Sequence, residues 1–224
     1  ASVFTFNESG LTANTVYFYR IYAKTATTTY VTNNPLTGIQ ATLQTEPTGA
    51  PGSFVVGSPT SSSLTGAFTA GTGATSYVVL QKLGSAVSPD APTDGTTYAL
   101  GNAIGSSTVV YVGVLGGLPF TPTGLNSNAV YHYAAFSAAG SGPSINYLTS
   151  AVATANRTTL VEDPIDQPSN LSFSNVTTTS FDVSFSDAPT IPDGYIVIRR
   201  ADAAVATAPT DGTAYSIGNP IGSG

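Results

Sequence analysis

The sequence has 224 residues, which is enough for one large domain or two ordinary ones. Only 8% of the residues are charged, the net charge is −6, and Lys and Arg together number six. So few cations exclude proteins that bind nucleic-acid phosphates or anionic membrane surfaces. The absence of Cys excludes disulfides, thiolate metal sites and Cys nucleophiles, and no stretch approaches the ~18 consecutive apolar residues that cross a membrane.

The first segment, residues 1–47, repeats a pattern found in the middle of the chain. Its residues match others at an offset of 114, which places Leu11 on Leu125. This internal similarity predicts that residues 1–47 are the C-terminal part of a first repeat. The matched residues are Phe6, Gly10, Leu11, Asn14, Val16, Tyr17 and Tyr19 with Phe120, Gly124, Leu125, Asn128, Val130, Tyr131 and Tyr133.

The middle segment, residues 48–158, carries a series of short apolar or alternating runs separated by residues that favour turns, such as Gly, Pro, Ser and Asn. Such runs predict β-strands, and seven of them in about 110 residues predict one complete Greek-key β-sandwich. The fold class is therefore all-β, with antiparallel sheets. The predicted strands are 52–57, 63–69, 76–82, 96–100, 108–115, 129–137 and 148–155.

The last segment, residues 159–224, matches the middle segment at an offset of 117, so that the run Pro-Thr-Asp-Gly-Thr occurs at 92–96 and again at 209–213. It is predicted to be the N-terminal part of a third repeat. The chain is then expected to be cut inside repeats, either as a window of a continuous chain or as subunits that join at that point.

The spacing Leu125-x5-Tyr131-x-Tyr133, which recurs from Leu11, resembles that of fibronectin type III domains. The resemblance implies that Tyr17 and Tyr131 are corner tyrosines whose hydroxyls return to nearby backbone. Two further roles are implied. Tyr77 and Tyr195 open a core strand, and Phe68 and Phe185 stand where the family usually carries a core Trp, which this chain lacks, so the likeness is fibronectin-like or immunoglobulin-like.

The segment with Pro-Thr-Asp-Gly-Thr-x-Tyr and Gly-Asn-x-Ile-Gly is similar to repeats of very large secreted adhesins and surface proteins of gliding and related bacteria. That likeness implies an extracellular location at the bacterial cell surface. Both resemblances imply a fold without an activity, and we expect no enzyme, no catalytic residue and no cofactor-binding residue.

Few residues have side chains suited to catalysis or metal binding. The one histidine, His132, lies between two tyrosines on a predicted strand without a carboxylate nearby in sequence. Asp94 and Asp211 recur at one position of the repeat and are predicted to form Asx turns in their own loops. The single dense group of carboxylates is a weak candidate for Ca²⁺, which takes six to eight oxygen ligands. It consists of Glu162, Asp163 and Asp166.

Three functions remain open. The first is a non-catalytic stalk or adhesion array, in which neighbouring repeats of one chain are the partners. The second is a filament subunit whose half-domains are completed by neighbouring subunits. The third is an accessory module of a secreted polysaccharide-degrading enzyme. A surface glycan or a protein ligand is an open partner, whereas nucleic acid and membrane insertion are not expected.

Overall fold

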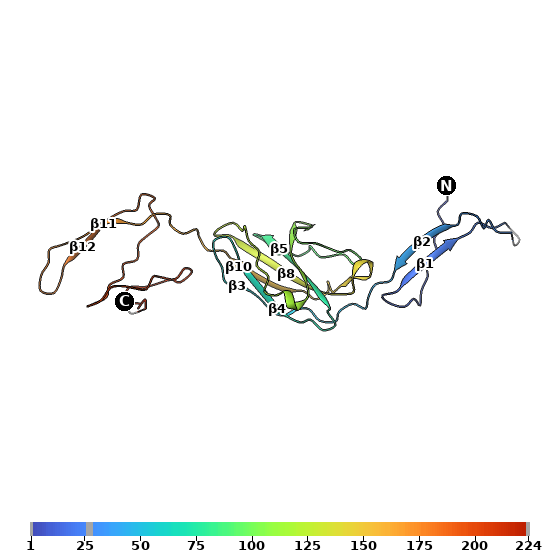
Figure 1. The fold of residues 1–224 in the computed structure, drawn as a ribbon, viewed down its shortest axis with the longest axis horizontal. Helices are drawn as coiled ribbons and strands as arrows, with labels where there is room; N and C mark the ends of the chain where they lie inside the picture. The colour runs from blue at the N-terminus through green and yellow to red at the C-terminus, as the bar shows by residue number, and fades with distance from the viewer. Residues whose placement is uncertain (1, 26–28, 223–224) are drawn as a thin grey trace. The chain divides into compact units, whose positions relative to one another are not determined.

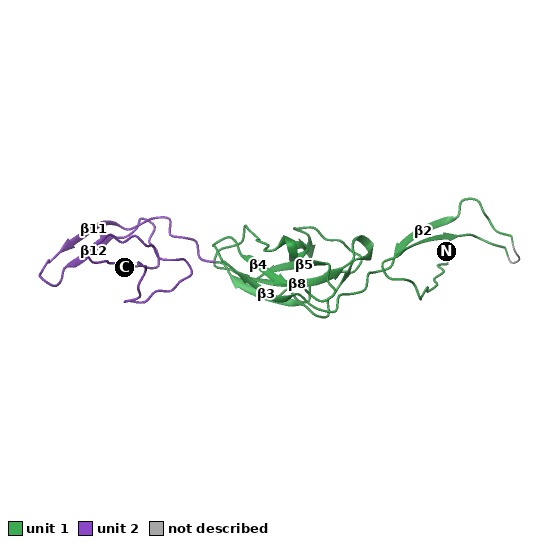
Figure 2. Ribbon diagram, turned by 60° about the horizontal axis from the view of Figure 1, so that its bottom comes forward, with its two compact units in different colours: residues 1–159 green, residues 160–224 purple. Residues whose placement is uncertain are grey.

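The structure is a computed structural model that describes residues 2–25 and 29–222. It divides into two compact units, Ala1–Thr159 and Leu160–Gly224 (Figure 2). For brevity, residues 1–47, 48–158 and 159–224 are called repeats 1, 2 and 3. The first unit contains repeats 1 and 2, and the second contains nearly all of repeat 3. No helix in the described part of the chain is long and apolar enough to cross a membrane.

Repeat 2 is a β-sandwich of two antiparallel sheets (Figure 1). The larger sheet has the order β10-β8-β5-β7-β6, with β9 paired to β8. The smaller sheet pairs β3 with β4, and bridges from Ser63 to Thr123 and from Gly66 to Phe120 add a third extended segment. The elements are β3 Gly52–Gly57, β4 Thr65–Thr69, β5 Ser76–Leu83, β6 Ala103–Ile104, β7 Ser107–Gly113, β8 Val130–Ala139, β9 Asn146–Tyr147 and β10 Ala153–Thr158, with 3-10 turns η1 Leu115–Gly117 and η2 Gly142–Ser144.

The chain passes from the small sheet to the large one after β4, returns at residues 120–123 and passes back at β8. This exchange of strands between sheets is that of a Greek-key sandwich. The structure is all-β and antiparallel, with a Greek-key β-sandwich as its complete repeat.

Two apolar clusters lie on opposite faces of the large sheet. Successive side chains of a strand point to opposite faces, and β5 supplies both clusters, because Val79 lies in the inner one and Leu80 in the outer one. The inner cluster fills the space between the sheets with Leu64, Phe68, Tyr77, Val79, Tyr111, Phe120, Tyr131, Tyr133 and Ala135. The outer cluster consists of Val78, Leu80, Val87, Ile104, Val109, Ala134, Phe136, Ala138, Ile145 and Tyr147.

The outer cluster is covered by residues 84–106, which we call the cover segment. Val87 and Ile104 are its buried members, and Ala91 and Tyr98 pack against them. The predicted strand 96–100 lies here and is wrong, because local turns capture its backbone. Thr93 N–H donates to Tyr98 Oη at 3.0 Å, and Ala99 N–H donates to Asn102 Oδ1 at 2.8 Å. The predicted strand 148–155 is displaced, since β10 begins only at Ala153.

Repeats 1 and 3 each contain one hairpin. In repeat 1, β1 Val16–Ile21 pairs with β2 Leu36–Ala41, as β8 pairs with β10 in repeat 2. In repeat 3, β11 Ser169–Ser174 pairs with β12 Asp182–Ser186, as β3 pairs with β4. Residues 195–198 of repeat 3 match the start of β5 but form no ladder. In repeat 2, β5 is paired on both sides by β7 and β8, and neither has an equivalent in residues 160–222.

Candidate functional site

The described residues contain no group of three His, Cys, Asp or Glu side chains that could hold a metal ion. Glu162 and Asp163 are exposed, and the Asp166 carboxylate accepts the backbone N–H of Thr190 at 3.1 Å. His132 lies on β8 opposite Asn156 of β10 and Lys82 of β5, so no carboxylate faces it across the sheet. The three carboxylates of the weak calcium candidate therefore do not gather into a metal-binding group in the described part of the chain.

The corner tyrosines make the same contact in two repeats. Thr12 N–H donates to Tyr17 Oη at 2.9 Å in repeat 1, and Asn126 N–H donates to Tyr131 Oη at 2.8 Å in repeat 2. In both cases the donor lies five residues before the tyrosine. The hydroxyl thus satisfies a turn amide that no strand can pair, which fixes the entry to the strand that follows.

A threonine that the sequence analysis did not single out completes each corner. Thr42 Oγ1 donates to Thr12 O at 2.6 Å and accepts Thr15 N–H at 3.0 Å. Thr159 Oγ1 donates to Asn126 O at 2.7 Å and accepts Ala129 N–H at 3.0 Å. The two threonines lie 117 residues apart, three more than the offset of 114 that aligns the corner tyrosines, and each is followed directly by a leucine. That recurrence is the signal in the sequence that could have identified them.

We expect Tyr131→Phe to lower the free energy of unfolding of repeat 2 by roughly 1–3 kcal/mol, since the partly buried Asn126 N–H loses its acceptor. Tyr17→Phe is the matched control, because the Thr12 N–H is exposed and water replaces the hydroxyl. Urea unfolding with hydrogen exchange at the β8 amides measures the difference. Equal losses in the two variants would contradict a role for burial at this corner.

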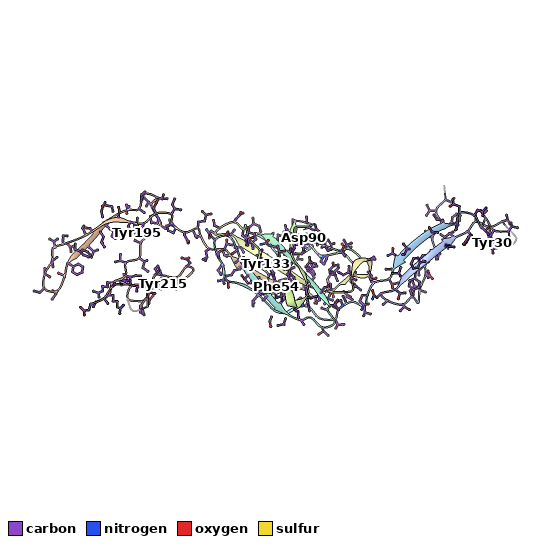
Figure 3. The ribbon with its side chains drawn as sticks, in the orientation of Figure 1. Tyr30, Phe54, Asp90, Tyr133, Tyr195 and Tyr215 are labelled. Atoms are coloured by element: carbon purple, nitrogen blue, oxygen red, sulfur yellow. The ribbon has the colours of Figure 1, made fainter. Side chains whose placement is uncertain are left out.

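An aromatic pair also recurs. Phe68 and Tyr77 have ring centroids 4.9 Å apart in repeat 2, and Phe185 and Tyr195 have centroids 5.0 Å apart in repeat 3. Tyr77 Oη accepts Gly71 N–H, and Tyr195 Oη (Figure 3) accepts Ala188 N–H. The burial differs, because Phe68 is 6% exposed and Phe185 is 36% exposed. Repeat 3 therefore holds the same pair in an open core.

A shallow apolar groove in repeat 3 is this open core. It is bordered by β11 and by residues 195–198, which match the start of β5. In repeat 2 the corresponding space is filled by the inner cluster. The groove therefore has the chemistry of an uncovered sandwich interior and carries no convergent polar groups of the kind that orient a small ligand. Its lining residues are Pro168, Ser169, Asn170, Leu171, Phe185, Tyr195, Ile196, Val197 and Ile198.

Asp90 ties the two ends of the cover segment to the sheet (Figure 3). Its Oδ2 accepts the Ser107 hydroxyl at 2.7 Å and the Ser106 N–H at 3.2 Å, and it lies 3.4 Å from Lys82 Nζ. The Ser107 hydrogen bond, followed by those from Lys82 and Ser106, lowers the pKa of Asp90 below its usual range against the opposing effect of burial. The carboxylate thus acts as a structural anchor that stays ionised.

Asp94 does not make the predicted Asx turn. Its Oδ1 accepts the backbone N–H of Tyr147 at 2.7 Å, and the neighbouring Gly95 N–H donates to Ile145 O at 2.8 Å. Tyr147 Oη in turn donates to Thr96 O at 3.0 Å. The Pro-Thr-Asp-Gly-Thr run of repeat 2 therefore joins the cover segment to β9 by a long-range contact.

Burial raises the pKa of both Tyr133 (Figure 3) and Tyr147 to about 12. In the unfolded chain these groups ionise near the ordinary value of 10, so the folded state holds protons that the unfolded state has lost. We therefore expect stability to fall as the pH rises from 10 towards 12. A spectrophotometric titration should show a group of tyrosines that ionise late and that includes Tyr133 and Tyr147, and Tyr133→Phe should reduce that group by one. A single transition of all tyrosines near pH 10 would contradict this assignment.

Comparison with models of protein families finds no match. Comparison with curated proteins finds none either. Among solved structures, the chain is similar to the "Central Fibronectin-III array of RIM-binding protein". The identity is 14% and the TM-score is 0.32, over 79% of this chain and 56% of that one. The chain thus spans little more than half of that structure, and the fold assignment rests on the sheets and clusters described above.

Proposed function

We propose that this chain is part of a non-catalytic array of fibronectin-like repeats, which serves as a stalk or adhesion fibre of a large extracellular bacterial surface protein. The observation that supports this most is the recurrence of the tyrosine and threonine corner in repeats 1 and 2. A corner repeated in register builds the same module again, and modules in tandem make an extended chain.

The chemistry of the described residues supports a structural or interaction role. The side chains of Asp90, Asp94 and Thr159 all hold backbone groups or neighbouring side chains in place. Low charge and a sulfur-free composition also suit a fibre exposed to solvent and oxidants.

Electron microscopy of the natural full-length protein tests this proposal. We expect beaded or filamentous particles, and protease treatment of intact cells should remove the protein from the surface. Isolated globular particles, or protection from protease in intact cells, would contradict the proposal. An accessory role beside a polysaccharide-degrading domain predicts glycan binding. Binding of the 224-residue chain to a glycan array would favour that accessory role over the stalk.

A filament subunit completed by half-domain exchange is the second candidate. The open core of repeat 3 favours it, since exposed sheet edges and apolar faces recruit another strand. Two cations, one on β1 and one just after it, argue against it. Beneath the cover segment, β8 carries Ala134 and Ala138, whereas the matching positions of repeat 1 carry Arg20 and Lys24. Placing those cations under the cover segment of repeat 3 would cost solvation energy.

Mass spectrometry of the natural subunit decides between the two candidates. A natural mass near 22.6 kDa, together with self-association, would support exchange of half-domains. A much larger mass in a continuous chain would support the array.

A further inference from the structure

The linker that leaves repeat 1 is held by repeat 1 up to Leu43. Thr42 is fixed by the corner described above, and its N–H also donates to Thr15 O at 2.9 Å. The next carbonyl, Leu43 O, accepts Asn14 N–H at 2.9 Å. Four hydrogen bonds therefore anchor two successive residues to the first repeat.

The following residue is held by repeat 2. Gln44 N–H donates to Ser144 O at 2.7 Å, and Asn146 Nδ2 donates to Gln44 O at 2.8 Å. The packing is close, because a Cβ added at Gly140 would lie 2.8 Å from Gln44 Cβ. Gly140 also has a φ of +86°, so glycine is required there on both counts.

The side chain of Leu43 completes the contact. Its Cδ2 would lie 4.0 Å from a Cβ at Gly95, in the Pro-Thr-Asp-Gly-Thr loop of repeat 2. The equivalent leucine one repeat later, Leu160, approaches Gly212 in the same way, with Cδ2 3.3 Å from that position. Both glycines have positive φ, +71° and +74°. The contact between the linker leucine and the loop glycine therefore occurs twice.

We propose that the Pro-Thr-Asp-Gly-Thr loop and residues 140–146 of each repeat form a docking surface for the Leu-Gln segment that leaves the preceding repeat. The partner is thus the linker of the neighbouring repeat, and the surface holds the two repeats in one relative orientation. Each residue from Thr42 to Gln44 is hydrogen-bonded to one of the two repeats, so the linker does not allow free rotation between them. This inference rests on the proposed function, since it takes the repeats to be neighbours in an array.

Distance measurement between two spin labels in the 224-residue chain tests this proposal. The protein has no Cys, so labels at Thr37→Cys on β2 and Thr108→Cys on β7, both exposed, are unique. We expect one narrow distribution of distances. In the Leu43→Ala, Asn146→Ala variant the distribution should widen about twofold, because a released linker samples a range of end-to-end distances.

Leu160→Ala is the matched control, since it removes the equivalent leucine one repeat later and should leave the distance between repeats 1 and 2 unchanged. Circular dichroism checks that each variant is folded. A broad distribution in the parent chain, or a narrow one that survives the double substitution, would overturn the docking surface. Microscopy of the natural protein tests the array separately, so either conclusion can fail while the other stands.

Discussion

Phe68→Ala is expected to lower the free energy of unfolding of repeat 2 by about 3–5 kcal/mol, the usual cost of deleting a buried phenylalanine ring. The ring is 6% exposed and lies at the centre of the inner cluster. It packs against Phe54 (Figure 3), Tyr77 and Tyr111, with centroid separations of 6.0, 4.9 and 6.0 Å. Few neighbours can collapse into the space it leaves, because both sheets already meet there.

Phe185→Ala is the matched variant, because it truncates the same repeat position where the ring is 36% exposed. We expect a loss below about 1 kcal/mol, as is typical of positions outside a closed core. Urea unfolding followed by tyrosine fluorescence, with hydrogen exchange to resolve the repeats, measures both. Equal losses would mean that repeat 3 closes a core of its own within this chain.

Leu80→Ala is expected to cost about 2–5 kcal/mol, although Leu80 points away from the space between the sheets. The outer face of a sandwich sheet is commonly solvated, and on such a face the same substitution would cost little. Here the cover segment encloses Leu80 with Val87 and Ile104, and the side chain is fully buried.

Leu83→Ala on the same strand is the control. Leu83 is 50% exposed, so its truncation should change stability by less than about 0.5 kcal/mol. The same unfolding measurement applies. If the two leucines gave similar small losses, the cover segment would be displaced from the sheet in solution, and the second core would not exist there.

The strands that could be predicted from sequence are those bounded by Gly or Pro and rich in apolar residues. Residues 52–57 were predicted as a strand and form β3, and the predicted strand 76–82 ends one residue short of β5. The run 96–100 alternates like a strand, yet its amides are captured by Asn102 and by the turn at Gly95. The alternation of apolar and polar residues in this run does not reveal that turns compete with a strand for its backbone amides.

Some residues of the candidate site could likewise be predicted from the sequence, and others could not. The corner tyrosines could be located because their spacing recurs in the chain, and the structure gives their hydroxyls the backbone donors that the resemblance implies. Asp94 shows the limit, because its acceptor role depends on Tyr147, a partner 53 residues away. The cover segment likewise folds over a sheet face built from three strands, and no single stretch of sequence encodes that placement.

Arg20 and Lys24 bear on how a chain of similar repeats avoids misfolding. Neighbouring repeats share one polypeptide, so their strands meet at millimolar effective concentration, and swapping of strands is a characteristic error of tandem proteins. If β1 and the residues after it took the place of β8 in repeat 2, two cations would be enclosed where Ala134 and Ala138 now lie. These charged residues therefore disfavour the exchange of strands between neighbouring repeats during folding.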